Sequence, residues 1–191
     1  VSQMCTDLMS PAVPLFMPTP NNLRKTGSDR DRFMPRPSAT QPWELALLEF
    51  VGRFIGIALR TRKPLDFNLS TVFWRRLVGE SVTLQDLRTA DDDFVRFIEL
   101  LGTPGDDMSE EEFELNFDDQ MFTAMDSEDN TVELVPGGTE LPLKLADRER
   151  YAKLALRMRV VECDTQVAAV RRGIGSIVPA HLLPLFTGEE P

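Results

Sequence analysis

Few residues of this 191-residue chain have the chemistry of a group-transfer catalyst. It contains two cysteines, Cys5 and Cys163, and one histidine, His181. A cysteine nucleophile needs a neighbouring base or positive charge that favours its thiolate. Cys163 stands instead between Glu162 and Asp164, which disfavour the thiolate, and His181 is remote in sequence from both cysteines. We therefore expect the histidine and the cysteines to be structural.

The spacing of other reactive residues also fails to match known sites. The chain has no glycine-rich phosphate loop, no zinc-ligand spacing and no serine-nucleophile elbow. The acidic run at 126–130 suggests a calcium loop, but Thr131 stands where the EF-hand needs glycine and Gly137 where it needs glutamate. The sequence predicts no metal and no cofactor, and it favours a binding module. A calcium-responsive module stays open as an alternative.

The charge of the chain is concentrated in one segment. The formal net charge is −10, and residues 80–147 hold 20 acidic residues but only 3 basic ones, Arg88, Arg96 and Lys144. Such a field repels nucleic acid and speeds encounter with a basic protein. A solvated acidic surface without a partner is the alternative interpretation. We expect a basic protein partner and no nucleic acid.

Length and composition indicate a soluble globular domain, or one with a sizeable insert. A chain of 191 residues can bury a core without a metal or a disulfide. The two cysteines lack a paired spacing, so we expect a reduced, cytoplasmic location, with the nucleus as the other option. No apolar run reaches the roughly 18 residues that span a bilayer, so we expect no membrane association. Because the first residue is Val1, we expect a piece of a longer polypeptide.

Residues 42–79 are expected to organise the fold as a pair of helices. The first helix is apolar around almost its whole circumference, except for a narrow polar strip that includes Gly52 and Gly56. A helix that is this apolar is expected to be enclosed by other elements. The two glycines indicate that another backbone packs closely against the polar strip. Ser70 is expected to cap the second helix, which should end at Gly79. Thr83 and Asp86, three residues apart, are expected to cap a short helix that follows and ends near Thr89.

A further helix, from the acidic triplet at 91–93 to about Leu101, is predicted to have two apolar faces. Three of its apolar side chains share the face that a core requires, whereas Phe97 and Leu100 point elsewhere. Either a partner covers the second face, or both faces are covered within the same fold.

Residues 113–117 are ambiguous between strand and helix. Ser109 and Glu112 have the spacing of a helix cap, but Phe113, Leu115 and Phe117 alternate with polar residues. The alternation favours a strand.

The rest of the chain gives simpler predictions. Residues 131–135 and 141–143 read as two strands joined by a glycine turn. Asp147 is expected to cap one long helix that ends at Gly173. The proline-rich N-terminal segment should be extended and wrapped on the domain, with a short strand at 15–17.

The order of these motifs resembles the N-terminal lobe of the HECT-type ubiquitin ligases. The glycine-arginine helix FVGRFIGIALR at 50–60 and the turn ELVPGG at 133–138 are the most specific matches. Further matching stretches are 15–21, 64–65, 73–79, 83–87, 148–151, 167–179 and 185–190. Together they follow the family's order over almost the whole chain.

The resemblance implies a mainly helical, α+β fold in two parts. Residues 1–80 together with 152–191 would form a larger helical subdomain, and residues 81–151 a smaller acidic insert of helices and a β-hairpin. In this family the smaller part binds a ubiquitin-conjugating enzyme. Ubiquitin then passes to a cysteine on a separate C-terminal lobe and on to a lysine of a protein substrate, which is bound through regions outside this chain.

The C-terminal lobe is absent from these residues, and neither Cys5 nor Cys163 matches the family's catalytic cysteine. The resemblance therefore implies that this chain contains no catalytic residue and is inactive on its own as a transferase.

The resemblance also implies a binding site for the conjugating enzyme. Phe97 and Leu100 fall where family members grip that enzyme, and Tyr151 falls where an aromatic residue joins the same groove. Asp93 and Thr103 stand where some members have bulky apolar residues. The acidic insert would suit a conjugating enzyme that presents lysines and arginines. The alternative is a non-enzymatic helical scaffold whose acidic insert binds another basic protein.

Overall fold

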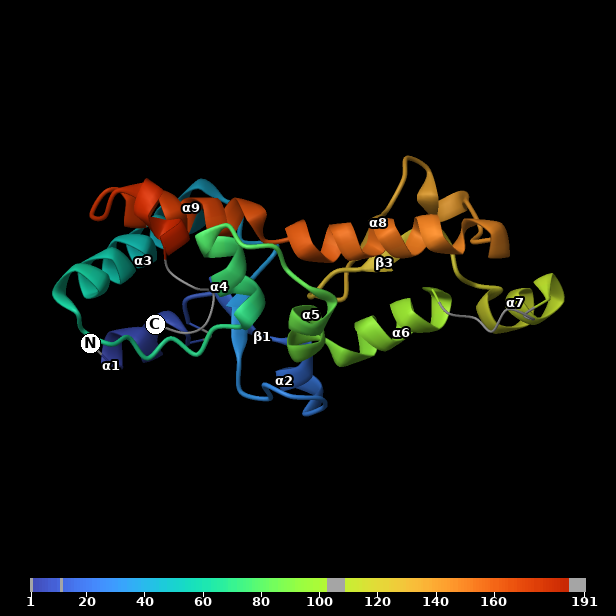
Figure 1. The fold of residues 1–191 in the computed structure, drawn as a ribbon, viewed down its shortest axis with the longest axis horizontal. Coiled ribbons are helices and arrows are strands. Elements are labelled where there is room, and N and C mark those ends of the chain that lie inside the picture. Colours follow the sequence, from blue (N-terminus) through green and yellow to red (C-terminus); the bar gives the residue numbers. More distant parts are fainter. Residues whose placement is uncertain (1, 11, 103–108, 186–191) are drawn as a thin grey trace. The chain divides into compact units, whose positions relative to one another are not determined.

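The structure is a computed structural model that describes residues 2–10, 12–102 and 109–185. The chain divides into two compact units, Val1–Asp92 with Cys163–Pro191, and Asp93–Glu162. Helices dominate the described part of both units, and each unit contains one two-stranded antiparallel sheet (Figure 1). The predicted mainly helical, α+β class is therefore confirmed.

The first unit is built around two helices, α3 (Pro42–Thr61) and α9 (Asp164–Gly175), which lie side by side (Figure 1). Its other elements are α1 (Ser2–Leu8), β1 (Phe16–Pro18), α2 (Pro20–Arg24), β2 (Phe33–Pro35), α4 (Thr71–Val78), α5 (Leu84–Ala90) and a 3-10 helix (Ala180–Leu185). Strand β1 pairs antiparallel with β2, with Met17 opposite Met34. The short strand predicted near 15–17 is thus present.

The helices α3 and α9 approach each other backbone to backbone. A Cβ atom at Gly52 would fall on the carbonyl oxygen of Val170, and one at Gly173 would fall on the carbonyl oxygen of Glu49. Only glycine leaves room for such an approach. The prediction that another backbone packs against the glycine strip is confirmed.

The prediction that α3 is enclosed on all sides is wrong. Trp43, Phe50 and Ile57 are 53%, 44% and 49% exposed, and they recur at helical spacing along one face. Leu48 and Val51, on another face of the helix, are buried. The sequence pattern shows that a side chain is apolar, but it does not show that a neighbour covers it.

Polar side chains attach two other segments to α9. The amide of the fully buried Gln166 donates to three backbone carbonyls of the segment 36–39, at 2.7 to 3.3 Å. Arg76 of α4 donates to both carboxylate oxygens of Asp164, the first residue of α9. These contacts hold the proline-rich segment and α4 against the same helix.

Three predicted helix boundaries are confirmed. The Ser70 hydroxyl accepts the backbone N–H of Phe73 at 3.3 Å and so caps α4. Gly79 ends α4 in a left-handed conformation, with φ of 89°. Thr83 and Asp86 cap α5 reciprocally, each accepting a hydrogen bond from the other's backbone N–H.

The described part of the second unit combines three helices with a small hairpin. Its elements are α6 (Asp92–Gly102), α7 (Glu110–Phe117), β3 (Thr123–Met125), β4 (Thr131–Glu133), two 3-10 turns (Gly138–Glu140 and Leu145–Asp147) and α8 (Arg148–Val161). Helix α6 begins at the acidic triplet, as predicted, where carboxylates favour a helix N-terminus. Strand β3 lies beside α8 (Figure 1).

The strand predicted at 113–117 is wrong, because these residues form the end of α7. Ser109 and Glu112 cap each other's backbone N–H groups and start the helix. Phe113 and Phe117, four residues apart, share one face with ring centroids at 4.8 Å, whereas Leu115 is 83% exposed. The local cap and the helical spacing outweigh the alternation.

The predicted hairpin has a different partner strand. Strand β4 pairs with β3, with Ala124 opposite Val132, and not with residues 141–143. The acidic run at 126–130 forms the connecting turn, in which the Asp126 carboxylate accepts two backbone N–H groups of the turn at 2.8 and 2.9 Å. An aspartate that closes a turn on its own backbone explains this run better than a calcium loop does.

The single helix predicted from 147 to 173 is also wrong, because the chain breaks between α8 and α9. The Glu162 carboxylate accepts the backbone N–H and the hydroxyl of Ser127, at 3.0 and 2.6 Å, in the hairpin turn. Burial raises the pKa of Glu162, and nearby Arg159 and the Ser127 hydrogen bonds oppose that shift. Asp147 makes no capping side-chain bond, since a 3-10 turn precedes α8.

We expect Gly52→Ala to lower the free energy of unfolding by about 1 to 3 kcal/mol, the usual cost of overpacking, because its methyl group meets a rigid backbone carbonyl. Urea denaturation followed by circular dichroism measures this change. Gly102→Ala is the control, since no atom of the described residues lies within 4 Å of the added Cβ. Two equally stable variants would contradict the backbone contact.

Candidate partner-binding site

The three side chains expected to bind a partner come from two helices of the second unit. Phe97 and Leu100 lie on α6, and Tyr151 lies on α8. The ring centroids of Phe97 and Tyr151 are 6.2 Å apart with an interplanar angle of 83°, an edge-to-face contact. Leu100 is 56% exposed, whereas Phe97 is half-buried. The structure thus brings Phe97 and Tyr151 together and leaves Leu100 at the surface beyond them.

Tyr151 lies beneath this surface, since only 1% of the tyrosine is exposed. Its hydroxyl donates to the carbonyl of Thr123 at 2.8 Å and accepts from the amide of Gln120 at 3.2 Å. Burial raises the pKa of Tyr151 to about 12. The phenol is therefore neutral at physiological pH, and its two hydrogen bonds hold the ring against Phe97.

A fourth aromatic residue, Phe117, belongs to the same cluster and was missed by the sequence analysis. Its ring lies 6.3 Å from that of Phe97 and is half-buried. The predicted strand gave no reason to single out Phe117, because in a strand Phe113, Leu115 and Phe117 would all share one face. The spacing of Phe113 and Phe117 after a capping serine was the signal that could have identified it.

The α7 side of this cluster is strongly acidic, whereas α8 exposes the basic residues Arg150, Lys153 and Arg157. Helix α7, whose Phe117 contacts Phe97, carries exposed carboxylates and no basic residue. They are Glu110, Glu111, Glu112 and Glu114, followed by Asp118 and Asp119. Asp93 on α6 is exposed, and Thr103 lies outside the described residues. An apolar edge bordered by carboxylates is suited to a partner with an apolar contact surface and basic residues around it.

The residues first considered for chemistry lie in the first unit. Cys5 is 1% exposed, and burial raises the pKa of its thiol. The thiol of Cys163 donates to the carbonyl of Pro35 at 3.3 Å, and His181 is exposed. Across residues 2–10, 12–102 and 109–185, no three histidine, cysteine or acidic side chains are grouped so that they could hold a metal ion. The helices described contain none with the length and apolarity to cross a membrane.

Comparison with known proteins identifies the class. Residues 2–190 match the family described as HECT-domain (ubiquitin-transferase), so the chain belongs to the HECT-domain family of ubiquitin ligases. The resemblance seen in the sequence is confirmed at the level of the family. Which lobe the chain represents stays a prediction.

Several individual ligases are similar to the chain. It is 35% identical to the E3 ubiquitin-protein ligase HERC2 of Homo sapiens over 190 residues, which cover 100% of this chain and 4% of that protein. It is 27% identical to the E3 ubiquitin-protein ligase ptr1 of Schizosaccharomyces pombe, covering 98% of this chain and 6% of the relative. The probable ligase hulA of Aspergillus terreus is 30% identical over 80% of this chain and 18% of its own length. The chain thus spans a small part of these relatives.

Tyr151 gives a direct test of the buried support, because it is the only tyrosine of the chain. We expect its phenolate absorbance to appear near pH 12 in the folded protein and near pH 10 in urea. The folded state holds the proton more tightly, so stability should be unaffected by this group below pH 10 and should fall as pH rises from 10 to 12. A folded-state midpoint near pH 10 would show that the ring is accessible to water.

Proposed function

We propose that this chain is the N-terminal lobe of a HECT ubiquitin ligase and that residues 81–151 recruit a ubiquitin-conjugating enzyme. Leu100 and Phe97 make the contact, and Tyr151 supports them from below. Residues 1–80 with 152–191 form the larger subdomain. The exposed Leu100 beside the Phe97–Tyr151 pair is the single observation that carries the proposal.

The exposure of Leu100 supports a contact with another protein. A leucine that is 56% exposed at the edge of a packed aromatic cluster offers apolar area that a partner can cover. The cluster beneath it is held by edge-to-face ring contacts and by the Tyr151 hydrogen bonds, so little ordering is needed on binding. A preformed contact of this kind suits a short-lived complex that must form and separate in each catalytic cycle.

The charge of the surrounding surface supports a basic partner. The carboxylates of α7 would attract lysines and arginines on a conjugating enzyme and raise the association rate at low salt. Their effect should fall as salt screens exposed charges. The alternative of a scaffold without ubiquitin chemistry predicts binding to basic proteins in general, and Leu100 would then not discriminate among them.

The chemistry proposed for the parent ligase takes place between two cysteines. The thiolate of the ligase attacks the carbonyl carbon of the thioester that joins ubiquitin to the conjugating enzyme, and that enzyme's thiolate leaves. The acceptor cysteine lies outside these 191 residues. The burial of Cys5 and its raised pKa support this assignment, since a buried thiol of raised pKa is a poor nucleophile.

We expect Leu100→Ala to weaken binding of a conjugating enzyme by about 2 kcal/mol, as for an apolar anchor in an interface, with little change in melting temperature. Leu115→Ala is the matched control, because Leu115 is 83% exposed on the face of α7 away from Phe113 and Phe117. Isothermal titration against a panel of conjugating enzymes measures both variants. Unchanged affinity of Leu100→Ala across the panel would refute the site.

We also expect this chain alone to form no ubiquitin thioester. The test mixes it with the activating enzyme, a conjugating enzyme, ATP and ubiquitin, and then looks for a thiol-sensitive adduct by mass spectrometry. Cys163→Ser should behave as the parent chain does, with no adduct and the same affinity for the conjugating enzyme. A ubiquitin adduct that is lost in Cys163→Ser would overturn the proposed inactivity.

A further inference from the structure

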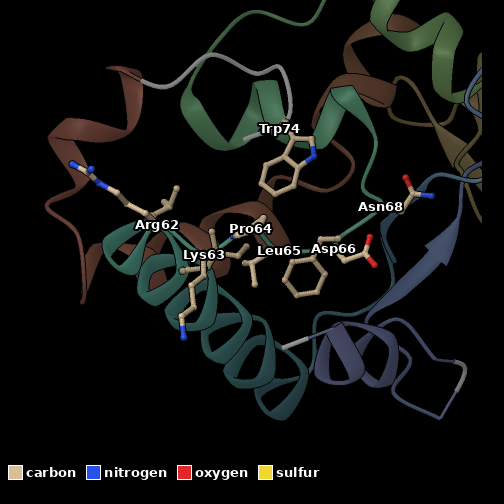
Figure 2. A pocket seen from close by; sticks show the side chains of 11 residues that line it. Arg62, Lys63, Pro64, Leu65, Asp66, Asn68 and Trp74 are labelled. Atoms are coloured by element: carbon tan, nitrogen blue, oxygen red, sulfur yellow. The ribbon is translucent and has the colours of Figure 1, made fainter.

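The first unit contains a pocket that plays no part in the proposed recruitment site. It has a volume of about 420 Å³ and lies between the C-terminal part of α3, the loop that follows it and Trp74 of α4 (Figure 2). Its walls are mainly apolar and are formed by Ile55, Ala58, Leu59, Pro64, Leu65 and Phe67. This volume falls within the range of pockets that bind small organic groups, about 300 to 1,000 Å³.

Trp74 gives the pocket a polar feature that the fold itself does not use. The residue is only 7% exposed, and its indole N–H finds no acceptor among the described residues. Figure 2 shows the indole facing the loop 63–68 across the pocket, with its nitrogen on the side towards Asn68. A buried donor normally has a partner, and leaving it unpaired costs free energy. A ligand with a carbonyl oxygen in the pocket would satisfy it.

The two ends of the pocket differ in charge. Arg62 and Lys63, exposed at one end, make no ion pair within the described part of the chain, and Arg60 lies just before them. Asp66 and Asn68 line the other end (Figure 2). This basic end belongs to the part of the chain with a positive balance, since 18 basic and 11 acidic residues lie outside residues 80–147. It would attract an anion, and Asp66 would keep the anion away from the opposite end.

We propose that this pocket binds a peptide segment of a partner protein that carries a large apolar residue followed or preceded by acidic residues. The apolar side chain fills the space under Trp74, and a backbone carbonyl of the peptide accepts the indole N–H. The acidic residues lie outside the pocket, beside Arg62 and Lys63.

The directions of the charged side chains favour a peptide over a small carboxylate. Figure 2 shows the side chains of Arg62 and Lys63 extending away from Trp74, and both residues are exposed at the rim of the pocket. A ligand bound in the pocket must therefore extend beyond it for its negative charge to reach Arg62 and Lys63. An extended chain does so within one or two residues, since each residue spans about 3.3 Å. It also supplies the carbonyl that Trp74 needs, because every peptide unit has one.

The test uses blocked synthetic peptides and the indole N–H signals of the two tryptophans in proton–nitrogen correlation spectra. Trp43→Phe assigns the signal of Trp74 by elimination. We expect one of the peptides EEFGG and GGFEE to shift this signal in a saturable way. Its dissociation constant should be about ten-fold lower than those of QQFGG and GGFQQ, which lack the charge. EEAGG and GGAEE, which lack the apolar side chain, should give no saturable shift.

Variants separate the two parts of the recognition. Arg62→Gln with Lys63→Gln should reduce the affinity for the charged peptide to that of its glutamine counterpart, with an unchanged melting temperature. Lys153→Gln, an exposed lysine that does not line the pocket, should leave the affinity unchanged. Trp74→Phe keeps an aromatic ring and should weaken both classes of peptide, because it removes the donor. Since this variant also loses the indole signal, its affinity and that of the parent chain are compared by isothermal titration.

Three results would overturn the proposal. They are the absence of a saturable shift at Trp74 with any peptide, equal affinity for the glutamate and glutamine peptides, and binding of N-acetylphenylalanine as tight as that of the best peptide. The last result would identify a site for a small carboxylate. Because the pocket shares no residue with the recruitment site, these results are independent of whether Leu100 binds a conjugating enzyme.

Discussion

The first unit depends on the close approach of the α3 and α9 backbones. Gly52 and Gly173 each leave space for a carbonyl of the opposite helix, and no side chain can be accommodated at either point. Helix α9 in turn holds the proline-rich segment through Gln166 and holds α4 through Asp164. Since α4 carries Trp74, the wall of the pocket is set by the same contact. A small change at one glycine would therefore reach several surfaces of this unit.

The second unit uses a different device, a buried tyrosine whose polar and apolar parts contact different elements. The hydroxyl of Tyr151 is bonded to the hairpin, and its ring is packed against Phe97 of α6. Tyr151 therefore links the hairpin and α8 to α6 and fixes the position of Phe97. Leu100 stands one turn further along that helix and needs no support of its own. Rigid support beneath and exposed apolar area above are the two features on which the proposed recruitment of a conjugating enzyme rests.

Local rules predicted much of this structure, and long-range contacts limited the rest. The glycine strip, the caps at Ser70 and Thr83 and the acidic start of α6 follow from short-range physics, and all are present. The break after α8 could not be predicted, because it depends on Glu162 bonding to a distant turn. The hairpin partner and the burial of Tyr151 likewise depend on which segments meet. Helical periodicity placed Phe97 and Leu100 on a second apolar face, and the family resemblance predicted their role. Phe117 was not predicted, because its segment was expected to be a strand.

The order of the elements along the chain has a consequence for biosynthesis. Helix α3 ends at Thr61, whereas α9 begins at Asp164, so the whole second unit is translated before α3 can meet its neighbour. Domains generally fold as units while the ribosome is still working. The second unit is contiguous in the sequence and can therefore fold first. During that time the apolar face of α3 that packs on α9 stays exposed in the nascent chain. The length of that interval, together with the stability of the folded unit, would then influence how much of the chain reaches its native state.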